Sequence, residues 1–316
     1  MKRFIYFDNL RSAAVILTVA ALLLQPWHAF YEESAVIAIS LVFFISAYFG
    51  ASALRTHMIP FFLKDKWKHL GWPGLVLFFL GLEESWLTAA LPVTSWVLLW
   101  LFLLFAGLAL AKHMSHSFLQ HRAAGRPSLL FLIGFFIVLS VLLFFCQTYL
   151  PKTLVLPYVA AFRPDWLILA AFAFALGVYA FRHRWFTASG YQPSGKLLFA
   201  FAVMVGVYAA IMGAHSVGIV TAIVPALLLL ASIFGLSGWV RTQFNSHTAW
   251  SHTLHRISYG FFFVSEPIIL HVMWFLQPLS AALWLKVVLT AVILVIYGFL
   301  LCRYALLHIP CFKSKG

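Results

Sequence analysis

The chain has 316 residues, of which 64% are hydrophobic and only 9% are charged, and its formal net charge is +13. Soluble globular domains are about half apolar and about a quarter charged, so this composition excludes a soluble domain and indicates an integral membrane protein. Its apolar runs are too long for the strands of an outer-membrane barrel, which are about ten residues with alternating polarity. We therefore predict an all-α helical bundle.

About ten apolar segments follow one another along the chain, each near the roughly 20 residues that cross a hydrocarbon core about 30 Å thick. The predicted spans are Leu10–Trp27, Ala35–Leu54, Pro73–Leu91, Ser95–Ala111, Leu129–Thr148, Trp166–Phe181, Leu197–Ala214, Val217–Val240, Ile257–Leu276 and Leu283–Leu301. No flexible linker, charged tract or internal repeat separates them, so residues 1–316 are expected to form a single transmembrane domain.

The basic residues of the loops are distributed unevenly between the two sides of the membrane. With a cytoplasmic N-terminus, only Lys152, Arg163 and Lys286 lie in outer loops, and the other basic loop residues lie inside. This bias predicts an even number of spans with both termini in the cytoplasm, and it explains the positive charge without a nucleic-acid partner. The alternative role of the basic loops is to dock an anionic cytoplasmic ligand, such as the phosphates of coenzyme A.

Charged residues near or inside the predicted spans are candidates for function. Arg11 stands at the start of the first span, where the simplest interpretation is a side chain that reaches lipid phosphates. Glu266 lies about ten residues into its span, where a carboxylate costs a few kcal/mol unless it is paired or protonated. It is either a structural partner, for Arg11 or at Pro267, or a general acid and base. Of the adjacent Glu83 and Glu84, only one can face the bundle interior squarely, because neighbouring helical residues diverge by about 100°.

Several short stretches resemble signatures of the bacterial type 3 membrane acyltransferases. They are Asp8-Asn9-Leu10-Arg11, Phe43-Phe44-Ile45-Ser46-Ala47-Tyr48-Phe49, the basic loop from Phe62 to Leu70 followed by Pro73, the run from Ile257 to Pro267, and His308-Ile309-Pro310. The resemblance implies a multi-pass protein of the bacterial inner membrane. Such a protein transfers an acetyl, succinyl or similar acyl group from a cytoplasmic donor, acyl-CoA, to a hydroxyl of a cell-envelope carbohydrate.

The chain departs from the family pattern at three functional positions. The family's first-helix histidine corresponds to Leu22, and an aliphatic side chain can neither accept a proton nor carry an acyl group. The family's Arg-x-x-Arg corresponds to Lys66 and His69, which lack the bidentate guanidinium fork. In the ninth span, Ser265 and Glu266 stand before Pro267 where the family usually has a histidine.

Three functional hypotheses follow. In the first, an acyltransferase with a rebuilt site uses Arg11, Lys66, His69 and Tyr259 to hold the donor, while Glu266 or Glu83, with Ser265, provides the catalytic groups. In the second, an inactive relative binds or translocates an acyl donor or glycan alongside an active partner protein. The third is a secondary transporter, which the absence of repeats disfavours. No histidine cluster has metal-site spacing, so we predict no metal.

Overall fold

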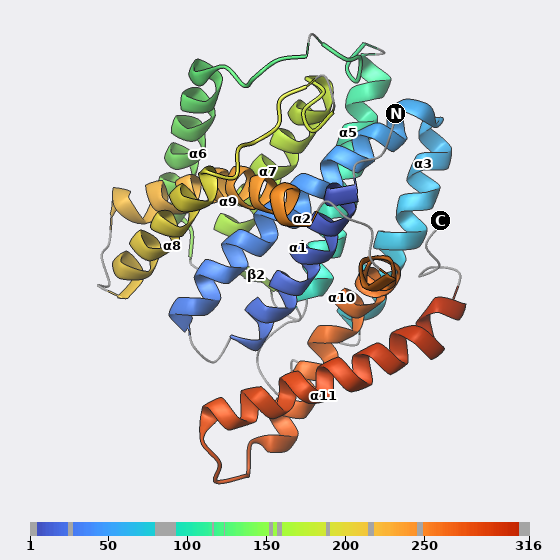
Figure 1. The fold of residues 1–316 in the computed structure, drawn as a ribbon, viewed down its shortest axis with the longest axis vertical. Coiled ribbons are helices and arrows are strands. Elements are labelled where there is room, and N and C mark those ends of the chain that lie inside the picture. The colour runs from blue at the N-terminus through green and yellow to red at the C-terminus, as the bar shows by residue number, and fades with distance from the viewer. Residues whose placement is uncertain are drawn as a thin grey trace.

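The computed structural model describes residues 5–24, 28–79, 93–115, 117–122, 124–151, 154–156, 160–187, 190–213, 218–244 and 249–309 (Figure 1). Its elements are α1 (Ile5–Leu23), α2 (His28–Thr56), α3 (Ile59–Lys66), the π-helix η1 (Trp67–Gly71), helical residues 72–79, α5 (Val93–Met114), α6 (Leu129–Tyr149), β1 (Leu154–Leu156), β2 (Ala160–Phe162), α7 (Pro164–Arg182), α8 (Leu197–Gly213), α9 (Ile219–Gln243), α10 (Ala249–Leu276), α11 (Leu283–Tyr304) and the 3₁₀ turn η2 (Leu306–His308).

The prediction of a helical membrane protein is confirmed. Within the described residues, seven helices are long and apolar enough to cross a membrane, and every predicted span overlaps a helix. The boundaries differ: α2 begins at His28, seven residues before the predicted start at Ala35, and α10 begins at Ala249, eight residues before the predicted start at Ile257. The connection between α6 and α7 also contains a short antiparallel hairpin that pairs Leu154 with Phe162, an element absent from the prediction.

Helix α2 is the central element and packs along α7, with α1, α5, α8 and α9 around it. Its fully buried side chains include Leu41, Phe43 and Phe44. The hydroxyl of Ser40 donates to the carbonyl of Val36 at 2.6 Å, so this buried polar group is satisfied within its own helix. The core is therefore mainly aromatic and aliphatic, and some of its buried hydroxyls, such as those of Ser40 and Ser232, bond within their own helices.

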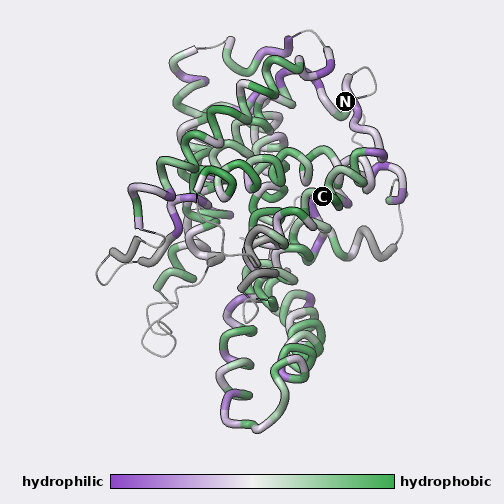
Figure 2. Tube along the Cα trace, turned by 90° about the vertical axis from the view of Figure 1, so that its left-hand side faces the viewer, coloured by the Kyte–Doolittle hydropathy of each residue, from purple (hydrophilic) through white to green (hydrophobic). Residues whose placement is uncertain are grey.

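The peripheral helices expose apolar side chains. Helix α6 and helix α11 are each only 22% buried over their most apolar stretch, and α11 lies with the second half of α10 at one edge of the molecule (Figure 1). Hydrophobic residues run along the helices, while hydrophilic ones gather mainly near helix ends and in connections (Figure 2). Exposed apolar surface of this extent is suited to contact with lipid chains.

Gly177 lets α7 approach the backbone of α2. A Cβ at this position would lie 2.3 Å from the carbonyl oxygen of Phe44 and 2.8 Å from the Cβ of Ala47. Neither atom belongs to a flexible side-chain end, so a methyl group would force the two helices apart. Gly177 thus sets the distance between the two most closely packed helices.

We expect Gly177→Ala to destabilise the fold by about 1–3 kcal/mol, the usual cost of overpacking a core. Gly134→Ala in α6 is the matched control, because nothing lies within 4 Å of a Cβ there. The control should be neutral or stabilising by up to about 1 kcal/mol, since alanine favours a helix over glycine. Unfolding of both variants in mixed detergent, followed by circular dichroism, measures the difference, and equal stability would contradict this account of the α2–α7 contact.

Candidate functional site

The candidate residues lie on three segments that the sequence separates widely. These are α1, the continuous stretch from α3 through η1, and α10, and α1 packs directly against α10. The stretch over α3 and η1 carries the basic residues that resemble the donor-binding loop of the type 3 membrane acyltransferases.

Lys66 is the last residue of α3 and is half-buried. Its ammonium nitrogen lies 4.7 Å from the ring centroid of Phe105 in α5 and 5.5 Å from that of Phe62. A cation over two aromatic faces gains a favourable electrostatic interaction while its charge stays close to the protein surface. Lys66 is thereby held in place against α5.

The helix changes to π geometry directly after Lys66, over Trp67–Gly71. Single π-turns inside longer helices are rare and frequently mark functional sites. Pro73 follows His69 by four residues, and because proline has no N–H it cannot donate the normal helical hydrogen bond to the carbonyl of His69. The hydroxyl of Tyr259 in α10 donates to this carbonyl instead.

The side chain of His69 faces Asp65, one helical turn earlier. Its Nε2 lies 3.7 Å from Oδ1 of Asp65, which is beyond hydrogen-bond distance, and the two side chains are 25% and 40% exposed. The pair is thus an open, partly solvated arrangement. A partly solvated imidazole beside a lysine is better placed to contact an anionic group than to pack in an apolar core.

Ser265 and Glu266 are buried in the middle of α10, at 0% and 4% exposure. The hydroxyl of Ser265 donates to the carbonyl of Phe262 at 3.0 Å, so its proton is used within its own helix. Glu266 stands seven residues after Tyr259, which places both on the same face of α10 about 10 Å apart along the axis. One face of α10 therefore carries the contact to η1 at one level and a buried carboxyl group two turns further on.

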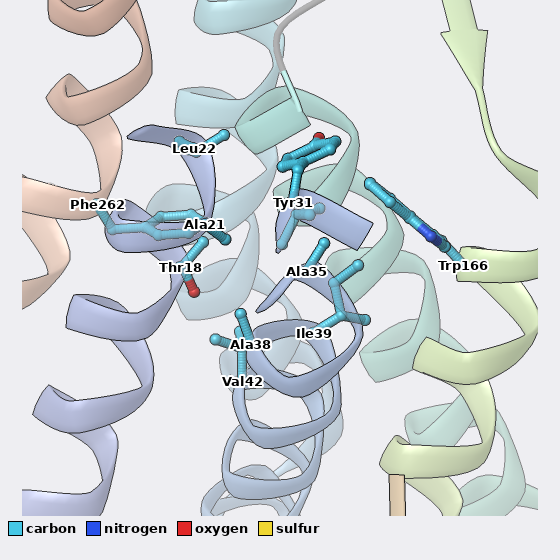
Figure 3. Close-up of a pocket in the computed structure, with 11 residues that line it drawn as sticks. Thr18, Ala21, Leu22, Tyr31, Ala35, Ala38, Ile39, Val42, Trp166 and Phe262 are labelled. Atoms are coloured by element: carbon cyan, nitrogen blue, oxygen red, sulfur yellow. The ribbon is translucent and has the colours of Figure 1, made fainter. Parts of the chain in front are cut away.

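Leu22, at the position where the family has its histidine, is buried against apolar neighbours. It is 3% exposed and belongs to a cluster with Val19, Ile269 and Leu294, which joins α1 to α10 and α11. The residue also lines a cavity between α1, α2, α5, α7 and α10 (Figure 3). The structure thus packs this position as part of an apolar interface.

The cavity has a volume of about 20 Å³, room for one water-sized molecule. Phe262 and Trp166 border it from opposite sides, and small alanines of α1 and α2 form much of the remaining wall (Figure 3). The hydroxyl of Thr18 donates to the carbonyl of Ala14 at 2.8 Å, so this polar group is already satisfied. With such apolar walls, this cavity offers little that would hold a reacting hydroxyl.

The structure brings together some of the predicted site residues. His69 and Tyr259 are in contact, Lys66 lies in the same stretch as His69, and Ser265 adjoins Glu266. Arg11 is partly buried in α1. Glu83 belongs to residues 80–92, which lie outside the described residues.

Sequence reasoning missed the π-helix and the Phe105 partner of Lys66. Pro73 was the available signal for the first, because a proline four residues after a helical residue leaves a carbonyl without its donor. The second had no local signal, because Phe105 lies about 40 positions later in the chain.

No group of three histidine, cysteine, aspartate or glutamate side chains in the described ranges is arranged to hold a metal ion. Comparison of the chain with protein-family models, curated proteins and solved structures finds no match.

We expect Tyr259→Phe to destabilise the protein by about 0.5–1.5 kcal/mol, because it leaves the carbonyl of His69 without its donor while keeping the ring. Tyr297→Phe in α11 is the matched control, since that side chain is 55% exposed. Unfolding in a titration with denaturing detergent measures both variants. Identical transitions would show that the Tyr259 hydroxyl does not join α10 to η1.

Proposed function

We propose that this chain is a membrane acyltransferase of the bacterial type 3 kind. Its substrates are an acyl-CoA donor carrying an acetyl, succinyl or similar group and a hydroxyl of a cell-envelope carbohydrate. The observation that supports this best is the contact between Tyr259 and His69, which are 190 positions apart. It joins two separate stretches that both resemble signatures of this family, as expected if they serve one site.

The proposal includes ten spans, with both termini cytoplasmic, in a bacterial inner membrane. The seven long apolar helices are supplemented by two shorter ones, at Asn9–Leu23 and Leu197–Tyr208. The predicted span Pro73–Leu91 begins within the helical residues 72–79 and would be the tenth. The excess of basic residues on one set of loops supports the cytoplasmic placement of the termini.

In this proposal, Arg11, Lys66 and His69, next to Tyr259, hold the phosphates of the donor on the cytoplasmic side. Glu266 accepts the proton of the carbohydrate hydroxyl as its oxygen attacks the thioester carbonyl carbon. A C–O bond forms, the C–S bond breaks, and coenzyme A leaves as a thiolate that takes up the proton. The burial of Glu266 inside α10, at 4% exposure, supports this role, because a general base must meet the substrate hydroxyl away from competing bulk water.

Ser265 and Glu83 are secondary candidates. Ser265 adjoins the carboxyl group, but its hydroxyl already donates to Phe262, which supports a structural role for it. Glu83 is an alternative base on the sequence evidence alone.

One observation favours a second function, a relative that binds the acyl donor without transferring the group. Leu22 occupies the position of the family's histidine and borders a small apolar cavity, so no proton acceptor stands there. In that case, the same scaffold recognises the donor or the glycan and acts with a catalytic partner protein.

We expect Glu266→Gln to lower acyl transfer or thioester hydrolysis at least about 100-fold, the usual contribution of a general base. The assay follows the free thiol of coenzyme A released from acetyl-CoA and from succinyl-CoA by purified protein in lipid nanodiscs. Asp165→Asn is the control, because it makes the same chemical change at a carboxylate that is already paired with Arg163.

Binding and thiol-release assays on the wild-type protein distinguish the two functions. Binding of acetyl-CoA without release of the thiol supports the non-catalytic relative. Thiol release that Glu266→Gln leaves unchanged would remove Glu266 from the mechanism.

A further inference from the structure

The C-terminal ends of α2 and α7 and the α5–α6 connection, which lie at one end of the bundle, carry a group of basic residues. We call it the arginine cluster, and its members are Arg55, His121, Arg122, Arg182 and Arg184. The backbone N–H of Arg122 donates to the carbonyl of Arg182 at 2.8 Å, which ties the α5–α6 connection to the end of α7. The His121 ring lies 4.9 Å from that of Phe181.

The cluster has no acidic counterpart. The sequence contains no aspartate or glutamate between Glu84 and Asp165 or between Asp165 and Glu266, so the segments that supply most of the cluster carry only positive charge. Within the described residues, none of its members forms an ion pair with a carboxylate. Positive groups held this close repel one another unless an anion lies between them.

The cluster also contains buried polar atoms with no hydrogen-bond partner in the described part of the chain. These are both ring nitrogens of His121 and Nε of Arg182. A buried polar group left in this way costs about 1–3 kcal/mol, which makes such groups rare in native proteins. These unsatisfied polar atoms of His121 and Arg182 therefore belong to the same cluster that carries the uncompensated positive charge.

The neighbouring charges also act on His121. Burial, helped by the positive charges of Arg55 and Arg184, holds the pKa of the His121 imidazole below its usual value, and backbone groups of Phe181 and Arg182 offset part of this shift. The free ring is therefore neutral at neutral pH and has one N–H to donate. The carbonyls of Phe181 and Arg182 lie near the ring but outside hydrogen-bond geometry, so an anion beside the ring would be a better placed acceptor.

A constrained turn after α7 presents Arg184 at the surface. Arg184 has φ 55° and Phe186 has φ 60°, a left-handed conformation that costs non-glycine residues about 1–2 kcal/mol each. Buried Trp185 anchors the turn, and its carbonyl accepts a hydrogen bond from the hydroxyl of Tyr48 at 2.8 Å. Gly190 packs on the same turn so closely that a Cβ there would lie 1.8 Å from the carbonyl oxygen of Arg184.

Lys112 is not a member of the cluster, because its ammonium group already donates hydrogen bonds to backbone carbonyls. It donates to the carbonyls of Leu54 and His57 and so closes the C-terminal end of α2.

We propose that the arginine cluster binds a phosphate group, whose oxygens accept hydrogen bonds from His121 and from the arginine guanidinium groups. The planar guanidinium fork matches two phosphate oxygens at once, which explains a cluster built mainly of arginine. The cluster lies where two spanning helices end, the level of lipid headgroups. The phosphate therefore belongs either to a phospholipid headgroup or to a soluble phosphate ester. This inference goes beyond the proposed function, because no cluster residue belongs to the acyl-transfer site.

The test measures binding without acyl transfer. Purified full-length protein in an uncharged detergent is titrated with inorganic pyrophosphate by calorimetry, and Arg184→Gln is compared with Arg303→Gln. Arg303 is an exposed arginine at the end of α11 and is the matched control. Loss of one charge-assisted contact should weaken binding about tenfold in Arg184→Gln and leave Arg303→Gln unchanged.

A second arm examines the lipid source. The protein is reconstituted in phosphatidylcholine nanodiscs with a minor fraction of phosphatidylglycerol, and the lipid that remains bound after purification is counted by native mass spectrometry. Retention of phosphatidylglycerol that Arg184→Gln abolishes identifies a lipid phosphate, and pyrophosphate binding with the same dependence identifies a soluble one. Arg122→Gln, an exposed position, repeats each comparison in case Arg184→Gln fails to fold. Absence of both effects overturns the proposal, whatever the acyl-transfer assay finds.

Discussion

Inside an apolar bundle every backbone carbonyl needs a hydrogen-bond donor. A proline has no N–H, so the carbonyl four residues before it must accept a hydrogen bond from elsewhere, and here the donor comes from a distant helix. Pro73 leaves the carbonyl of His69 to the hydroxyl of Tyr259, which joins η1 to α10. Pro225 acts in the same way in α9: the carbonyl of Thr221, four residues earlier, accepts a hydrogen bond from the side-chain amide of Gln147 in α6 at 3.4 Å. Each contact joins two segments that lie far apart in the sequence.

This requirement links the fold to the candidate site. The contact that satisfies His69 also orients α10, so Glu266 faces the same side as Tyr259 two turns further along the helix. The same helix contributes Phe262 to the cavity at Leu22, where the walls are apolar. The bundle therefore keeps its carboxyl group and its apolar pocket on neighbouring parts of one helix face. The basic residues lie elsewhere, near the helix ends, where water and headgroups can solvate them.

Sequence patterns predicted the helices well, because the length of an apolar run and the need to bond every backbone group leave few structures possible in a membrane. They also placed Glu266 well inside its helix, where the structure has it. They could not predict the aromatic partner of Lys66 or the left-handed turn at Arg184, since both depend on residues that only folding brings near. Phe105 and Tyr48 are examples, each far from the group that it contacts.

The sequence by itself determined that the protein is a helical membrane protein and roughly where its long apolar helices lie along the chain. Hydrophobicity and local hydrogen bonding act over a few residues and can be read directly from the chain. Only the tertiary structure decided that His69 meets Tyr259, that Leu22 borders an apolar cavity, and that arginines from separate parts of the chain lie near one another without a carboxylate partner among the described residues. These arrangements depend on which helix faces pack together, a property of the whole bundle.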